Sequence, residues 1–250
     1  MKKLLLTLFL LFIPSLVLAQ GRAFDGTGDN LKSADNAVAG LDVDQKSWGV
    51  WILKTVANAD ALIYGITADG GSPVTQIASA NPSSSGVRYD IAQSFSTTNG
   101  RWRTNDQTLS VRHHLAITYD RSATTNDPVM YIDGVSVTVN EAATPVGTTV
   151  TGEDTLKMGE DQAGTGDLDG TLAYVAIQAG SLWSAAQVNR AMWWGRPGGG
   201  LLVYHPLVTT KLVDEGSAAE TLTATNTTVA AFTTPVVRPG SAMLGMGVGW

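Results

Sequence analysis

The sequence predicts an all-β protein, an antiparallel sandwich or barrel, and three of its features support this. Beyond residue 20, short apolar runs alternate with clusters of Gly, Asn, Asp, Ser and Thr, as is typical of many short strands joined by turns. The runs are rich in β-branched and aromatic residues, which favour strands. The dipeptide Asp133-Gly134 favours a two-residue hairpin turn between two such runs. Together these features favour strands over helices for most of the chain.

Individual strands follow from the pattern within each run. The runs 47–53 and 61–67 are β-branched and aromatic, and 114–119 alternates larger apolar residues with smaller or polar ones. After the hairpin turn, the three valines of 135–139 share one face, while the serine and the threonine share the other. We therefore expect 135–139 to be a half-buried antiparallel strand.

One short helix is expected over 184–194. Ser184 and Gln187 fit a capping box, in which each side chain bonds to the other residue's backbone N–H. Gly195 and Pro197 then end the helix. The expected apolar face consists of Ala185, Val188 and Met192. We expect this helix to cover part of the core rather than to carry chemistry.

The first 19 residues are predicted to be a secretory signal peptide that is cleaved before Gln20. Lys2 and Lys3 form its positively charged start, residues 4–17 its apolar stretch, and Ala19 supplies the small residue at the cleavage site. A membrane-spanning helix needs about 20 apolar residues, more than this stretch offers. We therefore expect an exported protein, extracellular or periplasmic, with a bacterial-type signal peptide and no membrane insertion after cleavage.

Composition limits the size and the partners of the remaining chain. Residues 20–250 are long enough for one domain, with a core over 22–207 and a looser tail over 235–250. The absence of cysteine excludes disulfides, thiolate metal sites and a cysteine nucleophile. Lys and Arg number 16 against 22 Asp and Glu, giving a net charge of −6, and no basic block is present. Nucleic acid is therefore not expected as a partner.

Four segments match known motifs in their usual order along the chain. They are AFDGTGDNL at 23–31, SWGVWILK at 47–54, RHHLAITYD continuing to MYIDG over 112–134, and LKMG followed by LDGTLAYVAI over 156–177. In this order they resemble the concanavalin A-like lectin/glucanase superfamily, in particular its laminin-G-like jelly-roll domains. The resemblance implies a jelly-roll β-sandwich of two stacked antiparallel sheets, one concave and one convex. It also implies a domain that binds glycans or proteins.

The superfamily includes glycosidases that use two carboxylates on one strand, with the pattern Glu-x-Asp-x-Glu or Glu-x-Asp-x-x-Glu. This sequence contains neither pattern. The acidic pairs 153–154 and 160–161 would point to opposite faces of a strand, and Asp167 and Asp169 are expected in a loop. The histidines of 113–114 would also face opposite ways, as packed strand residues. We therefore expect a protein that is not an enzyme, with a glycoside hydrolase as the third alternative.

Calcium is the one cofactor that the sequence suggests. Ca²⁺ takes six to eight oxygen ligands, and the loops 25–30 and 167–170 offer carboxylates. Asp25, Asp29 and Asp169 are the candidate metal ligands, and the resemblance implies a structural calcium ion in such loops. The alternative is that these residues only form ordinary Asx-Gly turns.

Carbohydrate binding predicts an exposed aromatic ring beside hydrogen-bonding groups, because sugars stack on rings and bond through hydroxyls. Trp102 lies between Arg101 and Arg103 in a polar segment with Asn105, and these four residues form the predicted ligand site. At Trp193-Trp194 we expect one ring in the core and one partly exposed. The expected core tryptophans are Trp48, Trp51 and Trp183.

The sequence thus predicts a secreted, non-catalytic binding domain with a glycan or polysaccharide as its leading ligand. The alternative is a structural or adhesive domain that binds a surface protein. A lectin should expose an aromatic ring and amides on the concave face, whereas an assembly protein should expose an apolar patch or a free sheet edge.

Overall fold

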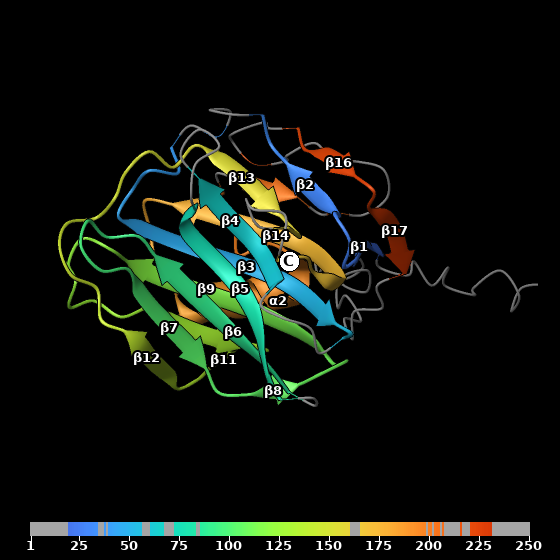
Figure 1. Cartoon of the computed structure of the whole chain (residues 1–250), viewed down its shortest axis with the longest axis horizontal. Helices are drawn as coiled ribbons and strands as arrows, with labels where there is room; N and C mark the ends of the chain where they lie inside the picture. The colour runs from blue at the N-terminus through green and yellow to red at the C-terminus, as the bar shows by residue number, and fades with distance from the viewer. Residues whose placement is uncertain are drawn as a thin grey trace, which may run out of the picture.

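Two antiparallel sheets stacked face to face form the protein in its computed structural model, which confirms the predicted β-sandwich (Figure 1). The predicted signal peptide, 1–19, and the predicted loose tail, 235–250, lie outside the described residues. The structure describes residues 20–34, 38, 40–56, 61–67, 73–83, 86–160, 166–198, 200, 201, 203–205, 207, 216 and 221–231.

The first sheet, here called the covered sheet, has the strand order β11-β10-β9-β3-β14-β1-β17, and β15 also pairs with β14. Its strands are β1 (Gln20–Asp25), β3 (Gln45–Lys54), β9 (Arg112–Asp120), β10 (Val129–Ile132), β11 (Val135–Ser136), β14 (Asp169–Ala179), β15 (Val203–His205) and β17 (Thr228–Ala231). All of its pairings are antiparallel.

The second sheet, here called the open sheet, has the order β12-β7-β6-β5-β4-β13-β2-β16, and β8 also pairs with β6. Its strands are β2 (Asn30–Lys32), β4 (Ala61–Thr67), β5 (Pro73–Ser83), β6 (Gly86–Gln93), β7 (Gly100–Thr104), β8 (Gln107–Thr108), β12 (Val139–Ala143), β13 (Thr155–Met158) and β16 (Thr223–Thr225). Each sheet includes a strand beyond the predicted core of 22–207, because β16 of the open sheet ends at Thr225 and β17 of the covered sheet ends at Ala231.

The predicted hairpin turn is confirmed, but the strand predicted after it is wrong. Asp133 and Gly134 both have positive φ values, 52° and 82°, as a tight turn between antiparallel strands requires. Strand β11 ends at Ser136, and the chain then crosses to the open sheet as β12. Val135 is therefore 67% exposed, because it lies at the edge of the covered sheet.

The space between the sheets is filled by large side chains from both. Trp48 and Ile52 of β3 meet Ile77 of β5, Ile91 of β6 and other residues in one continuous cluster. The predicted core tryptophans Trp48, Trp51 and Trp183 are all buried. At roughly 25 cal/mol for each Å² of apolar surface removed from water, this burial is the main stabilising contribution.

The outer face of the covered sheet is closed by the helix α2 (Ala185–Trp194), which confirms the predicted helix and its capping box. Its buried residues are Val188, Ala191 and Met192; Ala185, which was predicted to share this face, is exposed because it begins the helix. The indole Nε1 of Trp51 donates to the Met192 backbone carbonyl at 3.1 Å, which ties β3 to the helix. No helix among the described residues has the length and apolarity needed to cross a membrane.

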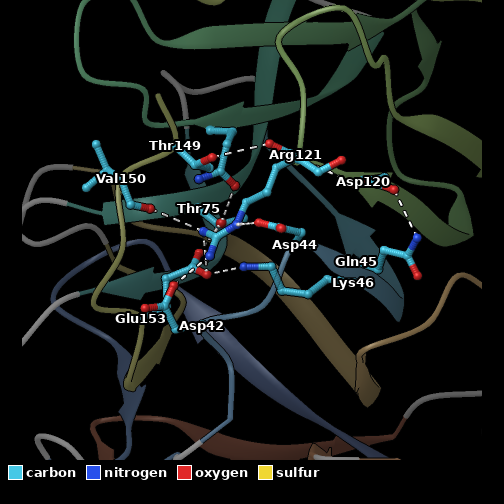
Figure 2. A network of polar contacts seen from close by, with 12 residues as sticks. Asp42, Asp44, Gln45, Lys46, Thr75, Asp120, Arg121, Thr149, Val150 and Glu153 are labelled. Atoms are coloured by element: carbon cyan, nitrogen blue, oxygen red, sulfur yellow. Dashed lines mark hydrogen bonds and ion pairs between the residues drawn. The ribbon is translucent and has the colours of Figure 1, made fainter. Parts of the chain in front are cut away.

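A buried network of charged side chains joins the two sheets (Figure 2). The carboxylate of Glu153 accepts hydrogen bonds from Lys46 of β3, Thr75 of β5 and Arg121. Arg121 also donates to Asp42 at 2.6 Å. Lys46, Arg121 and Glu153 are each at most 2% exposed. Burial lowers the pKa of Lys46 to about 8, although the attraction of Glu153 partly offsets this.

We predict that Glu153→Gln is strongly destabilising, because it leaves the charges of Lys46 and Arg121 buried without their shared carboxylate. Breaking such a buried pair costs about 3–5 kcal/mol. Urea unfolding at pH 7 measures the loss. Glu141→Gln, on the exposed strand β12, is the matched control and should change the free energy of unfolding by less than about 0.5 kcal/mol. Equal small losses in both variants would contradict a structural role for the network.

Candidate functional site

The outer face of the open sheet contains a pocket of about 320 Å³. It lies over β5, β6, β7 and β12. Its lining consists of Gln76, Ala78, Asp90, Ala92, Asn99, Gly100, Arg101 and Ala143. Half of these residues are alanine or glycine, so the pocket exists because larger side chains are absent from this part of the sheet. The other half are polar and planar, and they supply both hydrogen-bond donors and acceptors.

Asp90 is the centre of the polar lining. Its Oδ2 accepts from Arg101 Nε at 2.9 Å and from Arg103 Nε at 3.0 Å, while Arg88 Nε lies 3.4 Å from its Oδ1. The Asp90 side chain is only 2% exposed, whereas those of Arg101, Arg103 and Arg88 are 35%, 27% and 25% exposed. The carboxylate therefore lies beneath three guanidinium groups that remain within reach of solvent.

Strand geometry places these groups together. In the antiparallel register, Asp90 of β6 stands opposite Arg103 of β7, and Ala92 stands opposite Arg101. Paired residues of neighbouring strands share a face, as do residues two apart in one strand. Arg101 and Arg103 therefore extend from the same face of β7 toward the single carboxylate on β6.

The expectation that Trp102 is an exposed sugar platform is wrong. Trp102 is 0% exposed: it points between the sheets, where its ring lies 5.1 Å from that of Tyr119. Its Nε1 donates to Asp127 at 2.7 Å, and a Cβ on Gly100 would come within 2.3 Å of its ring. The reason is the strand period, because a residue between two outward arginines must point inward. The same alternation was visible in the sequence and could have identified Trp102 as a core residue.

The predicted ligand residues are thus only partly brought together. Arg101 lines the pocket, and Arg103 shares its carboxylate. Asn105 follows the end of β7, where its side-chain oxygen accepts from Asn140 at 2.9 Å, and it is not part of the lining. Asn99, which flanks Trp102 in the sequence, also borders the pocket, whereas Asp90 of β6 and Gln76 of β5 were not predicted because they belong to other strands.

The three predicted calcium ligands are neighbours, with Asp25 and Asp169 paired across β1 and β14. Their carboxylates already hold local hydrogen bonds: Asp29 accepts from the Asp25 backbone N–H, Asp25 from Thr27 N–H, and Asp169 from the Thr55 hydroxyl. In the described parts of the chain, no three His, Asp or Glu side chains gather closely enough to hold a metal ion. Calcium binding stays a prediction.

Folding places the carboxylate of Asp29 in an electrostatically unfavourable position. Burial raises its pKa, and the charges of Asp25 and Asp167 raise it further, against the hydrogen bond from Asp25 N–H. A carboxyl whose pKa is raised by folding contributes most stability at low pH, and this contribution is lost as the pH rises through the raised value. At neutral pH the full cost applies.

The two adjacent histidines are packed strand residues on opposite faces, as predicted. His113 points between the sheets toward Tyr89, and its Nδ1 lies 2.8 Å from Asp133 Oδ2. His114 points the other way, toward Trp51 beneath α2. Burial lowers the pKa of His114 to about 4, which the charge of Asp133 only partly offsets. The imidazole is therefore neutral at physiological pH.

The expectation that only one ring of Trp193-Trp194 is exposed is wrong, since both are 45% exposed at the end of α2. The buried residues of the helix are Val188, Ala191 and Met192, which leaves both indoles partly in solvent. Next to them, the guanidinium of Arg196 stacks 4.1 Å from the ring centre of Tyr204.

Comparison with known proteins identifies the fold. No protein-family model and no curated protein matches the sequence. A solved structure of a proposed carbohydrate-binding protein from Bacteroides ovatus matches with a TM-score of 0.64 and 14% identity, over 88% of this chain and 62% of that one. This chain therefore spans less than two thirds of that protein. A heptameric SAP-like pentraxin from Limulus polyphemus matches with a TM-score of 0.62 and 12% identity, over 88% of this chain and 98% of that one.

These similarities show that the chain has the concanavalin A-like jelly-roll fold, as the sequence motifs implied. The laminin α1 chain LG4-5 domains of mouse also match, with a TM-score of 0.47 and 11% identity, over 65% of this chain and 41% of that one. At these identities the comparisons concern the fold.

We predict that Asp29→Asn raises the melting temperature in EGTA at pH 7.5 by a few degrees, because it removes a buried charge that Asp25 and Asp167 repel. Differential scanning calorimetry measures the change, with the exposed Asp106→Asn as control. Repeating both scans in calcium tests the metal. Calcium at about a hundredfold excess over its Kd should stabilise a calcium-binding wild type by about 2.7 kcal/mol, and the variant less. Identical wild-type melting in calcium and EGTA would remove the calcium prediction.

Proposed function

We propose that the protein binds carbohydrate in the pocket on the outer face of the open sheet. The observation that carries this proposal is the pocket itself. Small side chains leave a space of about 320 Å³, which is bordered by Gln76, Asp90, Asn99 and Arg101. Binding pockets for small ligands have volumes of about 300–1,000 Å³. The pocket therefore has room for a sugar unit beside several hydrogen-bonding groups.

The chemistry of the lining suits hydroxyl-rich ligands. A sugar hydroxyl both donates and accepts, so it pairs with an amide, a carboxylate or a guanidinium. Gln76 and Asn99 supply amides, and Arg101 is held in place by its hydrogen bond to Asp90. Because the arginine is fixed before binding, less conformational entropy is lost when a ligand arrives.

The two outer faces of the sandwich differ, and this difference supports the open sheet as the binding face. Helix α2 packs on the covered sheet through Val188, Ala191 and Met192, so that face is occupied by the chain itself. The outer face of β5, β6 and β7 carries the pocket. The carbohydrate-binding description of the Bacteroides ovatus protein is consistent with the proposal at the level of the fold.

We propose a binding role rather than glycoside hydrolysis. A retaining glycosidase needs two carboxyl groups about 5–5.5 Å apart, and an inverting one needs about 6.5–9.5 Å. Among the described residues that line the pocket, Asp90 is the single carboxylate, and two arginines already donate to it. Glu153, which belongs to the acidic pair 153–154 of the sequence, is buried in the network between the sheets.

Export is part of the proposal. The residues 1–19 have the charge and the apolar stretch of a signal peptide. Strand β1 begins at Gln20, the predicted first residue after cleavage, and Gln20 pairs with Ala231 of β17. Cleavage at this position retains every described residue of the strand, in keeping with the proposed extracellular or periplasmic location.

Binding of a protein partner is the second candidate function. It is favoured by Trp193 and Trp194, two adjacent indoles that are each 45% exposed at the end of α2. Tryptophan is among the residues that contribute most energy to protein interfaces. This surface lies on the covered sheet, away from the pocket, so the two candidates can be separated by mutation.

We predict that the purified protein binds one class of glycan on an array and that Arg101→Ala weakens this binding at least tenfold. The loss of a fixed hydrogen-bond donor at the pocket is the reason, and tenfold corresponds to about 1.4 kcal/mol. Gln76→Ala is a second pocket variant that leaves the ion pairs intact. The control is Arg190→Ala, exposed on α2. An empty array with folded protein would overturn the proposal and favour the protein-binding surface at Trp193 and Trp194.

A further inference from the structure

The excess of positive charge around the pocket indicates which class of carbohydrate it would bind. Three guanidinium groups, from Arg88, Arg101 and Arg103, surround the single carboxylate of Asp90, which leaves two positive charges in excess. The chain as a whole has a net charge of −6. A local surplus of this sign is therefore not explained by the composition.

Asp90 alone does not require three arginines. Its Oδ2 is shared by Arg101 and Arg103, and Arg88 approaches its Oδ1 without forming a hydrogen bond. A guanidinium presents five N–H donors, so three such groups carry more donors than one carboxylate can accept. Their side chains are 25–35% exposed, so all three remain within reach of solvent, and Arg101 lines the pocket. Asp90 thus acts as a clamp that orders the arginines.

The lining also lacks what a neutral sugar site usually offers. None of the eight described lining residues is aromatic, so no ring is available for the stacking that binds neutral sugars. Affinity must then come from hydrogen bonds and charge. Hydrogen bonds between a guanidinium and an anion are roughly twice as strong as neutral ones, and the planar fork matches a carboxylate or a sulfate.

A row of residues in register with Arg101 crosses the open sheet. Pairing between strands places seven residues in one row, namely Lys32, Lys157, Gly65, Gln76, Ala92, Arg101 and Ala143. Arg101 and Lys157 are four strand spacings apart, about 19 Å at 4.8 Å for each spacing. The row has cationic residues toward both ends, small or amide side chains between, and no acidic residue. Lys157 is buried and forms an ion pair with Glu160 at 3.1 Å, so the unbalanced positive charge lies at the Arg101 end of the row.

We propose that the ligand is an acidic polysaccharide whose carboxylate or sulfate groups bind the guanidinium groups of Arg101 and Arg103. This inference rests on the proposed carbohydrate function and narrows its ligand class. An anionic group seated at the pocket receives donors from both arginines while Asp90 holds them in place. The chain of the polymer then runs across the strands over the small residues of the row.

The test compares polymers that differ in charge. Polygalacturonate, its fully methyl-esterified form and dextran sulfate are titrated by isothermal calorimetry in EDTA, which prevents calcium from bridging the polymers. We expect polygalacturonate or dextran sulfate to bind at least tenfold more tightly than the neutral ester, with affinity falling as salt rises. The preferred polymer identifies carboxylate or sulfate as the recognised group.

Three variants locate the site. Arg103→Gln should weaken binding of the acidic polymer at least tenfold, and Arg103→Lys should lose less because the charge remains without the planar fork. Arg190→Gln, which removes the same charge from α2, should bind like wild type. Circular dichroism melting shows that each variant is folded, and a second pocket variant, Arg101→Lys, repeats the comparison should Arg103→Gln fail to fold.

The outcomes separate this inference from the proposed function. Equal affinity for the acidic polymers and the neutral ester, or equal losses in Arg103→Gln and Arg190→Gln, would overturn the acidic ligand. Carbohydrate function would then still stand if a neutral glycan bound on the array and was lost in Arg101→Ala. Absence of binding to every glycan, neutral or acidic, would overturn both.

Discussion

Successive side chains of a strand point to opposite sides, and this constraint decides both what fills the sandwich and what its outer face presents. On β7 it directs Trp102 into the core and leaves Arg101 and Arg103 outside. On β6 it buries Ile91 and places Asp90 on the outer face opposite Arg103. The site therefore depends on the core, because packing of Trp102 against Tyr119 fixes the strand from which both arginines extend.

Besides the apolar core, a polar network connects the two sheets. The chain has no cysteine, so no disulfide can join the sheets, and Glu153 instead bonds to Lys46 on one sheet and Thr75 on the other. A buried ion pair adds little net stability compared with apolar packing, since the charges lose their hydration. Its directional bonds nevertheless restrict how the sheets can slide, because any shift leaves a charge unpaired in the interior.

Features encoded in neighbouring residues were predictable from the sequence, and features made by strand pairing were not. The turn at Asp133-Gly134 and the capping box at Ser184 depend on a few adjacent residues, and both were confirmed. The exit of the chain after Ser136 to the other sheet was not foreseen, because the valine alternation continues through it. Motif order was enough to identify the jelly-roll fold, since it reports on the whole chain rather than on one element.

The candidate site shows the same division. Arg101 and Arg103 were noted in the sequence, but they were assigned to a site with Trp102, which lies on the opposite face. Asp90 could not be assigned to the site from the sequence, because only the pairing of β6 with β7 places it beside the arginines. Glu153 was visible as one of an acidic pair, yet its partner Lys46 is 107 positions away. Long-range pairs of this kind cannot be recognised from neighbouring residues, whereas the inward direction of Trp102 could be inferred from the alternation along its own strand.

The acidic character of the whole protein and the cationic pocket are compatible, and their combination favours selective binding. At physiological ionic strength, charges more than about 8 Å apart are largely screened, so distant carboxylates do little to repel a polyanion already seated at the pocket. A net charge of −6 does, however, disfavour loose adsorption of polyanions elsewhere on the surface. An acidic polymer then gains affinity only where it contacts the clamped arginines directly. Arg101 and Arg103 would in this way set where the polymer binds, and Asp90 would set how it is oriented.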